Sequence, residues 1–464
     1  MSGNGIKDGM AEGQESETFF SAIVVTLSLA TVIGLLMLVC GFGTSGSSQG
    51  NAESEDISNA EKTNNKSKKA KGNQPGKRQQ KQQVKRGGQS TFSHPLLAST
   101  LKEHSSNVLD LDFSMNGKYL ASCAEDRTVR VWSVKEFKDK VHKCLRGNVE
   151  YDHVTKIKFS PDCKAFITSL SIGNCIRVFK MAKKEDGSSS TISASLDFPK
   201  ILSTDIINIG LGSHAHGSFV MMAYKDTTIQ ICDVKGEILQ SIDTHHMNNN
   251  YAAVSPCGRF VASCGFTPDV KVWEVLFNKE GDFNEVKRVM DLKGHRASVY
   301  YLSFNTDSTR MATVSKDTTW KLWDTNVEYN KNQDPYLLYT GTYNHTGPSL
   351  LALSPDAHTV AIASGVRIMV YNATTGEEEE SFEDVHTQPI TKIGFDPSNR
   401  FLVSCGDRHI RVFHNVVGYR SNIASMEKKI KMSTTTKTQK ERMQSQIRLM
   451  SECLAEILGE SPKV

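Results

Sequence analysis

A nine-residue phrase, KDTTWKLWD at 316–324, recurs in altered form along the chain and limits the possible folds more than any other feature. Its pattern is an Asp, two further residues, and then alternating apolar positions that end in an aromatic residue. Related phrases are DRTVRVW (126–132), GNCIRVF (173–179), DTTIQIC (226–232), TPDVKVW (267–273), GVRIMVY (365–371) and DRHIRVF (407–413). Each phrase predicts one short, half-buried strand that follows a tight turn.

The spacing of these strands gives the size of the repeating unit. Successive strand ends are 47, 53, 41, 50, 48 and 42 residues apart, near the ~40–45 residues of a four-stranded propeller blade with short insertions. The end positions are Trp132, Phe179, Cys232, Trp273, Trp323, Tyr371 and Phe413. We therefore expect residues 91–420 to be all-β, a seven-bladed β-propeller. The alternative is a ring of six blades, in which one interval between the recognisable repeats does not contain a blade.

A ring of blades has to be closed, and the segment before the first repeat can close it. TFSHPLLASTLKEH (91–104) alternates apolar and polar residues as a strand does. We expect it to supply the outer strand of the seventh blade, so that the two ends of the ring are joined.

Most repeats also carry polar residues that can form one hydrogen-bond network, whereas three of them have Gly or Thr at the position of the turn Asp. A His in the loop before a blade, a Ser or Thr on its second strand, the turn Asp and the terminal Trp can satisfy one another. Leaving one such buried group unpaired costs about 1–3 kcal/mol, so we expect a structural rather than a catalytic role. The upstream histidines are His104, His153, His245, His295, His345 and His386. The residues assigned to the network are His104, Asp126, Trp132, Asp226, Trp273, His295, Asp317, Trp323, His386 and Asp407.

The ten cysteines form no disulfide framework and no C-x-x-C motif. Cys123, Cys264 and Cys405 occupy the same place in three similar phrases, as small apolar residues inside strands would. Scattered thiols favour a reducing compartment.

The repeats resemble the WD40-repeat family across 91–420, which makes a seven-bladed WD40 propeller the expected fold. The phrases at 251–275, 315–338 and 404–415, behind an apolar N-terminal segment, are similar to one membrane-anchored branch of that family. That resemblance implies a protein of the endoplasmic reticulum membrane without enzymatic activity or cofactor. It further implies association with the stress-activated kinase of that membrane, which phosphorylates a translation initiation factor, and a role in the unfolded-protein response.

An uncharged segment of 24 residues at 19–42 follows an acidic lead at 1–18. As a helix it would extend about 36 Å, enough to cross a ~30 Å hydrocarbon core. A cleaved signal peptide is the alternative, but the apolar run is long and its leading segment is not basic. Lys and Arg are concentrated after this segment, which favours a cytosolic C-terminal side, although the first of them lies twenty residues beyond it. Asn65, Asn344 and Asn372 begin glycosylation sequons that test this orientation.

Residues 43–90 have the composition of a flexible basic linker, with ten Lys or Arg against four acids. They are either a solvated spacer or a contact for anionic lipid headgroups or RNA phosphates. No aromatic residues lie between the basic ones, so base stacking is not expected. The candidate contact residues are Lys62, Lys66, Lys68, Lys69, Lys71, Lys77, Arg78, Lys81, Lys85 and Arg86.

The tail at 421–464 reads as an amphipathic helix. Met443, Ile447, Met450, Leu454 and Ile457 form an apolar stripe of only about two heptads, short for a coiled coil. The helix either packs onto the propeller or frays, or its stripe associates with a partner or a second copy.

Three classes of function can be compared from these features. The leading hypothesis is a membrane-anchored scaffold that docks protein partners on the cytosolic face of the endoplasmic reticulum. An enzyme is disfavoured because the chain has no P-loop, no HExxH motif and no metal-spaced cluster. The histidines in HAHG (214–217) and at 245–246 lie in expected loops without convergent partners. The alternative to the scaffold is an RNA- or ribosome-associated adaptor that uses the basic segment 62–86.

Overall fold

The computed structural model describes residues 92–183, 190–199, 203–344, 347–432 and 436–459. The predicted acidic lead, the predicted membrane segment at 19–42 and the basic linker before residue 91 lie outside these residues. Neither α-helix in the described part is long and apolar enough to cross a membrane.

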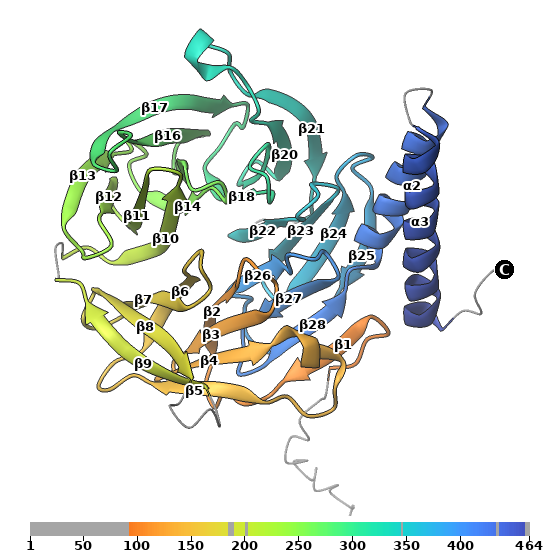
Figure 1. Ribbon diagram of the computed structural model, residues 1–464, viewed down its shortest axis with the longest axis horizontal. Coiled ribbons are helices and arrows are strands. Elements are labelled where there is room, and N and C mark those ends of the chain that lie inside the picture. The colour runs from red at the N-terminus through yellow and green to blue at the C-terminus, as the bar shows by residue number, and fades with distance from the viewer. Residues whose placement is uncertain (1–91, 184–189, 200–202, 345–346, 433–435, 460–464) are drawn as a thin grey trace, which may run out of the picture. The chain divides into compact units, whose positions relative to one another are not determined.

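The described residues form seven four-stranded antiparallel sheets arranged as the blades of a ring (Figure 1). Blade 1 contains β2 (Val108–Phe113), β3 (Tyr119–Ala124), β4 (Thr128–Ser133) and β5 (Cys144–Asn148). Blade 2 contains β6 (Val154–Phe159), β7 (Ala165–Leu170), β8 (Ile176–Lys183) and β9 (Ser190–Asp197). Blade 3 contains β10 (Ile206–His214), β11 (Gly217–Tyr224), β12 (Thr228–Cys232) and β13 (Ile238–Asp243). Blade 4 contains β14 (Asn249–Val254), β15 (Phe260–Gly265), β16 (Asp269–Phe277) and β17 (Phe283–Lys293).

The remaining blades continue the same order around the ring. Blade 5 contains β18 (Val299–Phe304), β19 (Arg310–Ser315), β20 (Thr319–Asp324) and β21 (Tyr336–Thr342). Blade 6 contains β22 (Ser349–Leu353), β23 (Thr359–Ser364), β24 (Arg367–Asn372) and β25 (Glu378–Phe382). Blade 7 contains β26 (Lys392–Phe395), β27 (Phe401–Cys405), β28 (Ile410–His414) and β1 (Leu97–Leu101). Short 3-10 helices η1 (Val134–Lys138) and η2 (Tyr329–Lys331) follow β4 and β20. The prediction of seven blades is confirmed, and the alternative of six is wrong.

The ring is closed by β1, as predicted. This strand pairs antiparallel with β28, with Thr100 opposite Arg411 and Leu101 opposite Ile410. The side chain of Leu101 is 1% exposed and lies in a cluster with Val403 and Val412. The first strand of the propeller therefore completes the sheet that the last strands begin.

The core lies between neighbouring sheets because blade strands are buried on both faces. The first strand of each blade contacts the first strands of the two adjacent blades, so seven inner strands surround a central channel. The second strands are almost fully buried, and Cys123, Cys264 and Cys405 on them are 0% exposed. These three are free thiols and serve as small apolar core residues, as predicted from their placing.

The C-terminal tail is helical, as predicted, but it begins earlier than residue 421 and forms two helices. Helix α2 (Val416–Lys431) starts two residues after β28, and α3 (Lys437–Leu458) packs against it. The pair lies beside the outer strands of blade 6 (Figure 1). Val416 and Val417 are 2% exposed because they belong to the core between blades 6 and 7. The helical part therefore continues the propeller instead of following a separate boundary.

Along α3, the predicted apolar stripe is the part of the helix that is shielded from solvent. Most residues of the helix outside the stripe are exposed, whereas the five stripe residues are half-buried: Met443, Ile447, Met450, Leu454 and Ile457. Leu454, Ile457 and Leu458 pack against the cluster that contains Val416 and Val417. Of the two alternatives for this stripe, the structure gives packing within the chain.

Candidate functional site

The ring has two ends with different loops, and we name them by what they carry. The "His–Asp face" contains the loops between blades and the turns between second and third strands, such as 125–127. The "inner-turn face" contains the turns between first and second strands, such as 114–118. These two faces and the channel between them hold the polar residues that could act on a ligand or a partner.

Blade 5 contains the complete network that the repeat predicts. The His295 Nδ1 atom lies 3.1 Å from Asp317 Oδ2, and its Nε2 atom lies 2.8 Å from the Thr313 hydroxyl. The indole N–H of Trp323 donates to the same hydroxyl at 3.0 Å. The hydroxyl can accept from Trp323 and donate to His295 only if the imidazole is neutral with its proton on Nδ1. In that tautomer the hydrogen bonds of the network run in one direction, from the indole N–H to the carboxylate.

Blade 1 repeats this arrangement, and blade 7 repeats it without the indole, because Phe413 takes the place of the tryptophan. In blade 1, His104 lies 2.9 Å from Asp126 and 2.8 Å from the Ser122 hydroxyl, which accepts from Trp132 at 2.9 Å. In blade 7, His386 lies 3.1 Å from Asp407 and 2.9 Å from the Ser404 hydroxyl. A guanidinium, that of Arg411, also lies 3.3 Å from the Asp407 carboxylate. These side chains hold strands together within one blade.

Burial and hydrogen bonding set the charges in these networks. Burial lowers the pKa of His295 to about 4, against the opposing effect of Asp317. Burial alone would raise the pKa of Asp126, but hydrogen bonds from His104 and Thr128 hold it well below its usual range. The pKa of Asp407 is lowered in the same way by His386 and His409. The lowered pKa values keep the Asp126, Asp317 and Asp407 carboxylates ionised and His295 neutral, so these groups serve as fixed hydrogen-bond partners.

Blade 4 departs from the prediction because the adjacent histidine takes the network position. His246, not His245, is fully buried; it bonds to Thr267 and lies 3.0 Å from the Ser263 hydroxyl. The side chain of His245 is 71% exposed. Trp273 is buried in β16, and among the described residues its indole makes no hydrogen bond to the Ser263 hydroxyl, the counterpart of Thr313 in blade 5. The blade therefore lacks the indole bond found in blades 1 and 5.

The turn Asp is replaced or repartnered in the weaker blades. In blade 2 the carboxylate comes from the preceding loop, where Asp152 accepts from the backbone amides of Ile172 and Gly173 at 3.0 and 2.8 Å. In blade 3, Asp226 accepts from the Thr204 hydroxyl at 3.1 Å in place of a histidine. Blade 6 has a Ser349–Ser364 hydroxyl contact of 3.0 Å. His345, predicted for this blade, lies outside the described residues.

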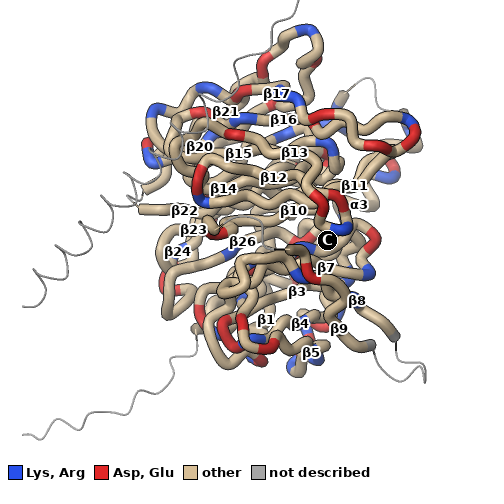
Figure 2. Tube along the Cα trace, turned by 90° about the vertical axis from the view of Figure 1, so that its left-hand side faces the viewer, with Lys and Arg blue, Asp and Glu red and all other residues tan. Residues whose placement is uncertain are grey.

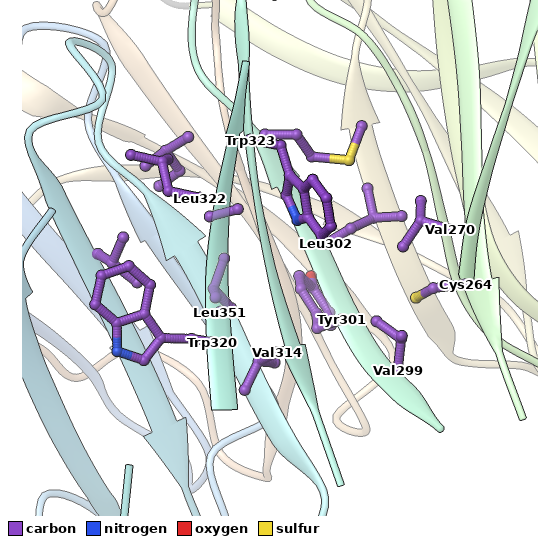
Figure 3. Close-up of a cluster of buried hydrophobic side chains, with 14 of the residues drawn as sticks. Cys264, Val270, Val299, Tyr301, Leu302, Val314, Trp320, Leu322, Trp323 and Leu351 are labelled. Atoms are coloured by element: carbon purple, nitrogen blue, oxygen red, sulfur yellow. The ribbon is translucent and has the colours of Figure 1, made fainter. Parts of the chain in front are cut away.

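Trp320 lies on the same strand as Trp323 but serves a different interface. The two indoles lie on opposite sides of β20 (Figure 3). The Trp320 ring centroid lies 5.4 Å from that of Tyr339 and 5.7 Å from that of Tyr371 on blade 6. Its indole N–H is buried and has no hydrogen-bond partner among the described residues. Trp320 therefore joins two blades by packing alone.

Charged residues inside the central channel were not singled out from the sequence. The Lys392 ammonium donates to the Tyr301 hydroxyl at 2.8 Å and lies 3.6 Å from Asp110. The rings of Tyr251 and Tyr301 stack with centroids 3.7 Å apart. One register position, three residues before the last residue of an inner strand, carries a polar side chain in five blades. The residues at this position are Asp110, Lys156, Tyr251, Tyr301 and Lys392. Aligning the inner strands of the repeats at that position would have revealed this layer.

The His–Asp face carries large apolar side chains that are exposed to solvent. Tyr151 and Ile172 are 88% and 73% exposed in adjoining loops of blade 2. Met247 and Phe266 are 69% and 59% exposed in the corresponding loops of blade 4. Tyr151 and Met247 also have φ values of 60° and 65°, which a bulky residue rarely adopts. Strained, exposed apolar residues of this kind are typical of binding surfaces.

Two further kinds of site were weighed from the sequence, a metal site, which was not expected, and a basic contact surface in the linker. Within the residues that the structure describes, no group of three or more His, Cys, Asp or Glu side chains could hold a metal ion. The ten basic residues of the linker, from Lys62 to Arg86, lie outside that part. In the view of Figure 2, Lys and Arg positions are interspersed with Asp and Glu positions along the trace of the described residues.

The comparisons with known proteins agree with the repeat and the ring. A family model described as WD domain, G-beta repeat matches residues 96–133, 286–324 and 378–414. Transducin beta-like protein 2 of Mus musculus is 49% identical over 92% of this chain and 96% of its own length. The Homo sapiens protein of the same name is 51% identical over 83% of this chain and 86% of its own length. A more distant relative, actin-interacting protein 1 of Drosophila melanogaster, is 26% identical over 65% of this chain and 46% of its own length. The chain therefore belongs to the transducin beta-like protein 2 family of WD40-repeat proteins.

Proposed function

We propose that this protein is an interaction scaffold anchored in the endoplasmic reticulum membrane by residues 19–42, with its propeller in the cytosol. Its partner is the kinase of that membrane which phosphorylates a translation initiation factor, and its role lies in the unfolded-protein response. WD40 propellers dock protein partners and are generally without enzymatic activity. The uncharged segment at 19–42 and the basic residues after it support the anchoring and its direction.

The observation that carries the docking role is the exposed apolar surface of the His–Asp face. We name the four side chains Tyr151, Ile172, Met247 and Phe266 the "apolar pairs". The turn amide of Ile172 bonds to Asp152, beside Tyr151, and the amide of Phe266 bonds to the carbonyl of Asn248, beside Met247. Each pair is therefore held by its own blade and is available to a partner without rearrangement of the ring.

Glycine at the two strained positions gives a selective test. Tyr151→Gly with Met247→Gly removes two exposed apolar side chains, and glycine adopts positive φ without strain. We expect folding to be retained or slightly improved and capture of the kinase by the full-length chain to fall at least tenfold. Val234→Ser with Ile238→Ser, which removes exposed apolar residues of β13 and the preceding turn, is the matched control. Equal capture by both variants would contradict docking through the apolar pairs.

The location is tested separately from the docking. Proximity labelling with the intact protein, repeated after removal of residues 1–90, separates partners reached through the membrane from partners bound by the propeller. Asn344 is exposed and begins a sequon, whereas the Asn372 amide donates to Glu379 at 2.7 Å and is already engaged. A glycosidase-sensitive change in gel mobility that Asn344→Gln abolishes would contradict a cytosolic propeller.

A second candidate function is contact with RNA through the basic segment 62–86. One relative is named ribosome biogenesis protein YTM1 and is 27% identical over 38% of this chain. Nonspecific phosphate contacts by the ten basic residues would weaken steeply with salt. Replacing those residues with Gln and measuring salt-sensitive RNA retention tests it; unchanged retention would exclude this function.

A further inference from the structure

The central channel contains a chamber that the scaffold role does not use. We name the cavity at the inner-turn end of the channel, about 320 Å³ in volume, the "lumen chamber". Its polar lining includes Asp112, Lys158, Tyr251, Tyr301 and Lys392. A second cavity of about 290 Å³ adjoins it and shares Asp112 and Lys158. Lys158 therefore lies where the two cavities meet.

The lining of the lumen chamber contains two lysines, Lys158 and Lys392, and one aspartate, Asp112, so one ammonium group is in excess there. Lys158 donates to Asp112 at 2.6 Å, and Lys392 lies 3.6 Å from Asp110. Lys156, in the same layer as Lys392, has no carboxylate partner among the described residues. Burial would raise the pKa of Asp110, but Lys392, Lys156 and Lys158 together lower it. Three lysines thus face two aspartates, and the channel favours an anion.

Lys158 has donors available for such an anion. An ammonium group has three N–H donors, and the described residues occupy one of them, through Asp112. Both oxygens of Asp112 are already engaged, one by Lys158 and the other by the Phe159 amide at 2.8 Å. The carboxylate is therefore fixed in place and cannot turn to occupy the other donors of Lys158.

Both chamber lysines remain charged. Burial alone would lower their pKa values, but Asp112 raises that of Lys158 above its usual range. Tyr251, Tyr301 and Asp110 raise that of Lys392 well above its usual range. The Lys392 ammonium also lies 5.5 and 5.6 Å from the two tyrosine ring centroids, where cation–π attraction stabilises it.

The chamber wall toward the inner-turn face is mostly apolar, with Ser303, Asn305 and Thr306 as polar exceptions. Its lining there includes Phe113, Met115, Pro256, Phe304, Pro355 and Phe395. A bound group would thus meet apolar side chains at the mouth and an ammonium group farther inside. This combination is typical of sites for small amphipathic ligands, in which few polar groups fix the orientation.

We propose that the lumen chamber binds a small organic acid whose carboxylate contacts Lys158 and whose apolar portion lies against the inner-turn mouth. The volume supports a small ligand, because it lies at the lower end of the ~300–1,000 Å³ that such sites occupy. The carboxylate would accept charge-assisted hydrogen bonds from Lys158. This site is separate from the apolar pairs, which lie on the opposite face.

The test measures binding of defined probes to the full-length chain, purified in a nonionic detergent, by saturation-transfer NMR. Hexanoate should bind to the chamber. Hexanamide should bind at least tenfold more weakly because it lacks the charge. Acetate and inorganic phosphate should also bind at least tenfold more weakly, because each lacks the apolar portion. Equal binding of hexanamide would overturn the role of Lys158. Equal binding of acetate or phosphate would overturn the role of the apolar mouth. Tighter binding of a Leu-Glu-Leu peptide would assign the chamber to a protein segment and overturn the small-ligand proposal.

Two independent variants identify the chamber as the site. Lys158→Met keeps the length of the side chain but removes the charge, and Lys158→Arg restores it. A Cβ added at Gly394, which lines the chamber, would meet no atom within 4 Å, so Gly394→Leu fills the space without removing a polar group. We expect Lys158→Met and Gly394→Leu to bind hexanoate at least tenfold more weakly than the unchanged chain, and Lys158→Arg to recover the binding. The control Lys164→Met, on an exposed turn, should leave hexanoate binding unchanged. Unchanged binding by the well-folded Gly394→Leu variant would overturn the assignment.

Discussion

At the scale of single residues, His295 links the stability of the propeller to pH. It is a neutral imidazole between Thr313 and Asp317, and burial lowers its pKa from 6.5 to about 4. Burial lowers the pKa of His246 in blade 4 to about 4 as well. Neither histidine can take up a proton without losing a partner or becoming a buried charge.

The sign of the pH dependence follows from these directions. Between pH 6.5 and about 4 the unfolded chain binds more protons than the folded chain, so the free energy of unfolding falls as pH decreases through that window. We expect roughly 1–2 kcal/mol to be lost per such histidine between pH 7 and 5. Urea unfolding at several pH values measures this loss. The variant His295→Gln should show a weaker dependence of the unfolding free energy on pH, because it lacks the contribution of His295. An unchanged slope would contradict a neutral His295.

The two indoles of β20 permit a matched comparison. Trp320→Phe leaves a small cavity and removes an unpaired N–H, so we expect a loss of about 1 kcal/mol in unfolding free energy. Trp323→Phe leaves a similar cavity but also deprives the Thr313 hydroxyl of its donor, which should cost about 1–3 kcal/mol more. Denaturant unfolding of both variants measures the difference. A larger loss for Trp320→Phe would contradict the structural role assigned to the network.

At the scale of elements, strand β1 should control the cooperativity of the ring. Leu101→Asp places an unpaired charge in the core between blades 7 and 1, where Leu101 is 1% exposed. We expect destabilisation of more than about 3 kcal/mol, or failure to fold. Lys102→Asp at the neighbouring exposed position should change the unfolding free energy by no more than about 0.5 kcal/mol. Thermal unfolding checks both, and a stable Leu101→Asp variant would mean that closure is dispensable.

The helical tail offers a second element-scale prediction. Leu454 packs against the cluster of Val416 and Val417, whereas Leu449 on the same helix is 63% exposed. Leu454→Asp should release α3 and increase its amide hydrogen exchange, because an apolar contact is replaced by a charge. Leu449→Asp should leave the exchange unchanged. Equal protection in both variants would show that the stripe contributes little to docking of the helix.

The elements also show which features a single sequence can reveal. The third strands of the seven blades were predictable because each ends a recognisable phrase, and β1 was predictable because a ring needs one more strand than the repeats supply. The network histidine of blade 4 was misassigned because His245 and His246 are adjacent, and only the path of the loop decides which one turns inward. Asp152 was missed because its carboxylate reaches the turn of blade 2 from another loop.

At the scale of the whole molecule, the channel could not be predicted from any one repeat. The residues in contact there, such as Asp110, Tyr301 and Lys392, come from strands separated by 90 to nearly 300 positions. Each looks like an ordinary polar residue at the edge of a half-buried strand. Their proximity arises only when seven blades place the same register position around one axis.

The same closure has a consequence for the synthesis of the chain. Leu101 pairs with Ile410, so more than 300 further residues must leave the ribosome before β1 can find its sheet. At about 5–20 residues per second this takes roughly 15–60 s. Throughout that time β1 is an unpaired apolar strand, able to join a foreign edge. We therefore expect newly made chains to depend on a chaperone until their last blade is translated, and nonsense mutations in that blade to yield chains that aggregate instead of shorter rings.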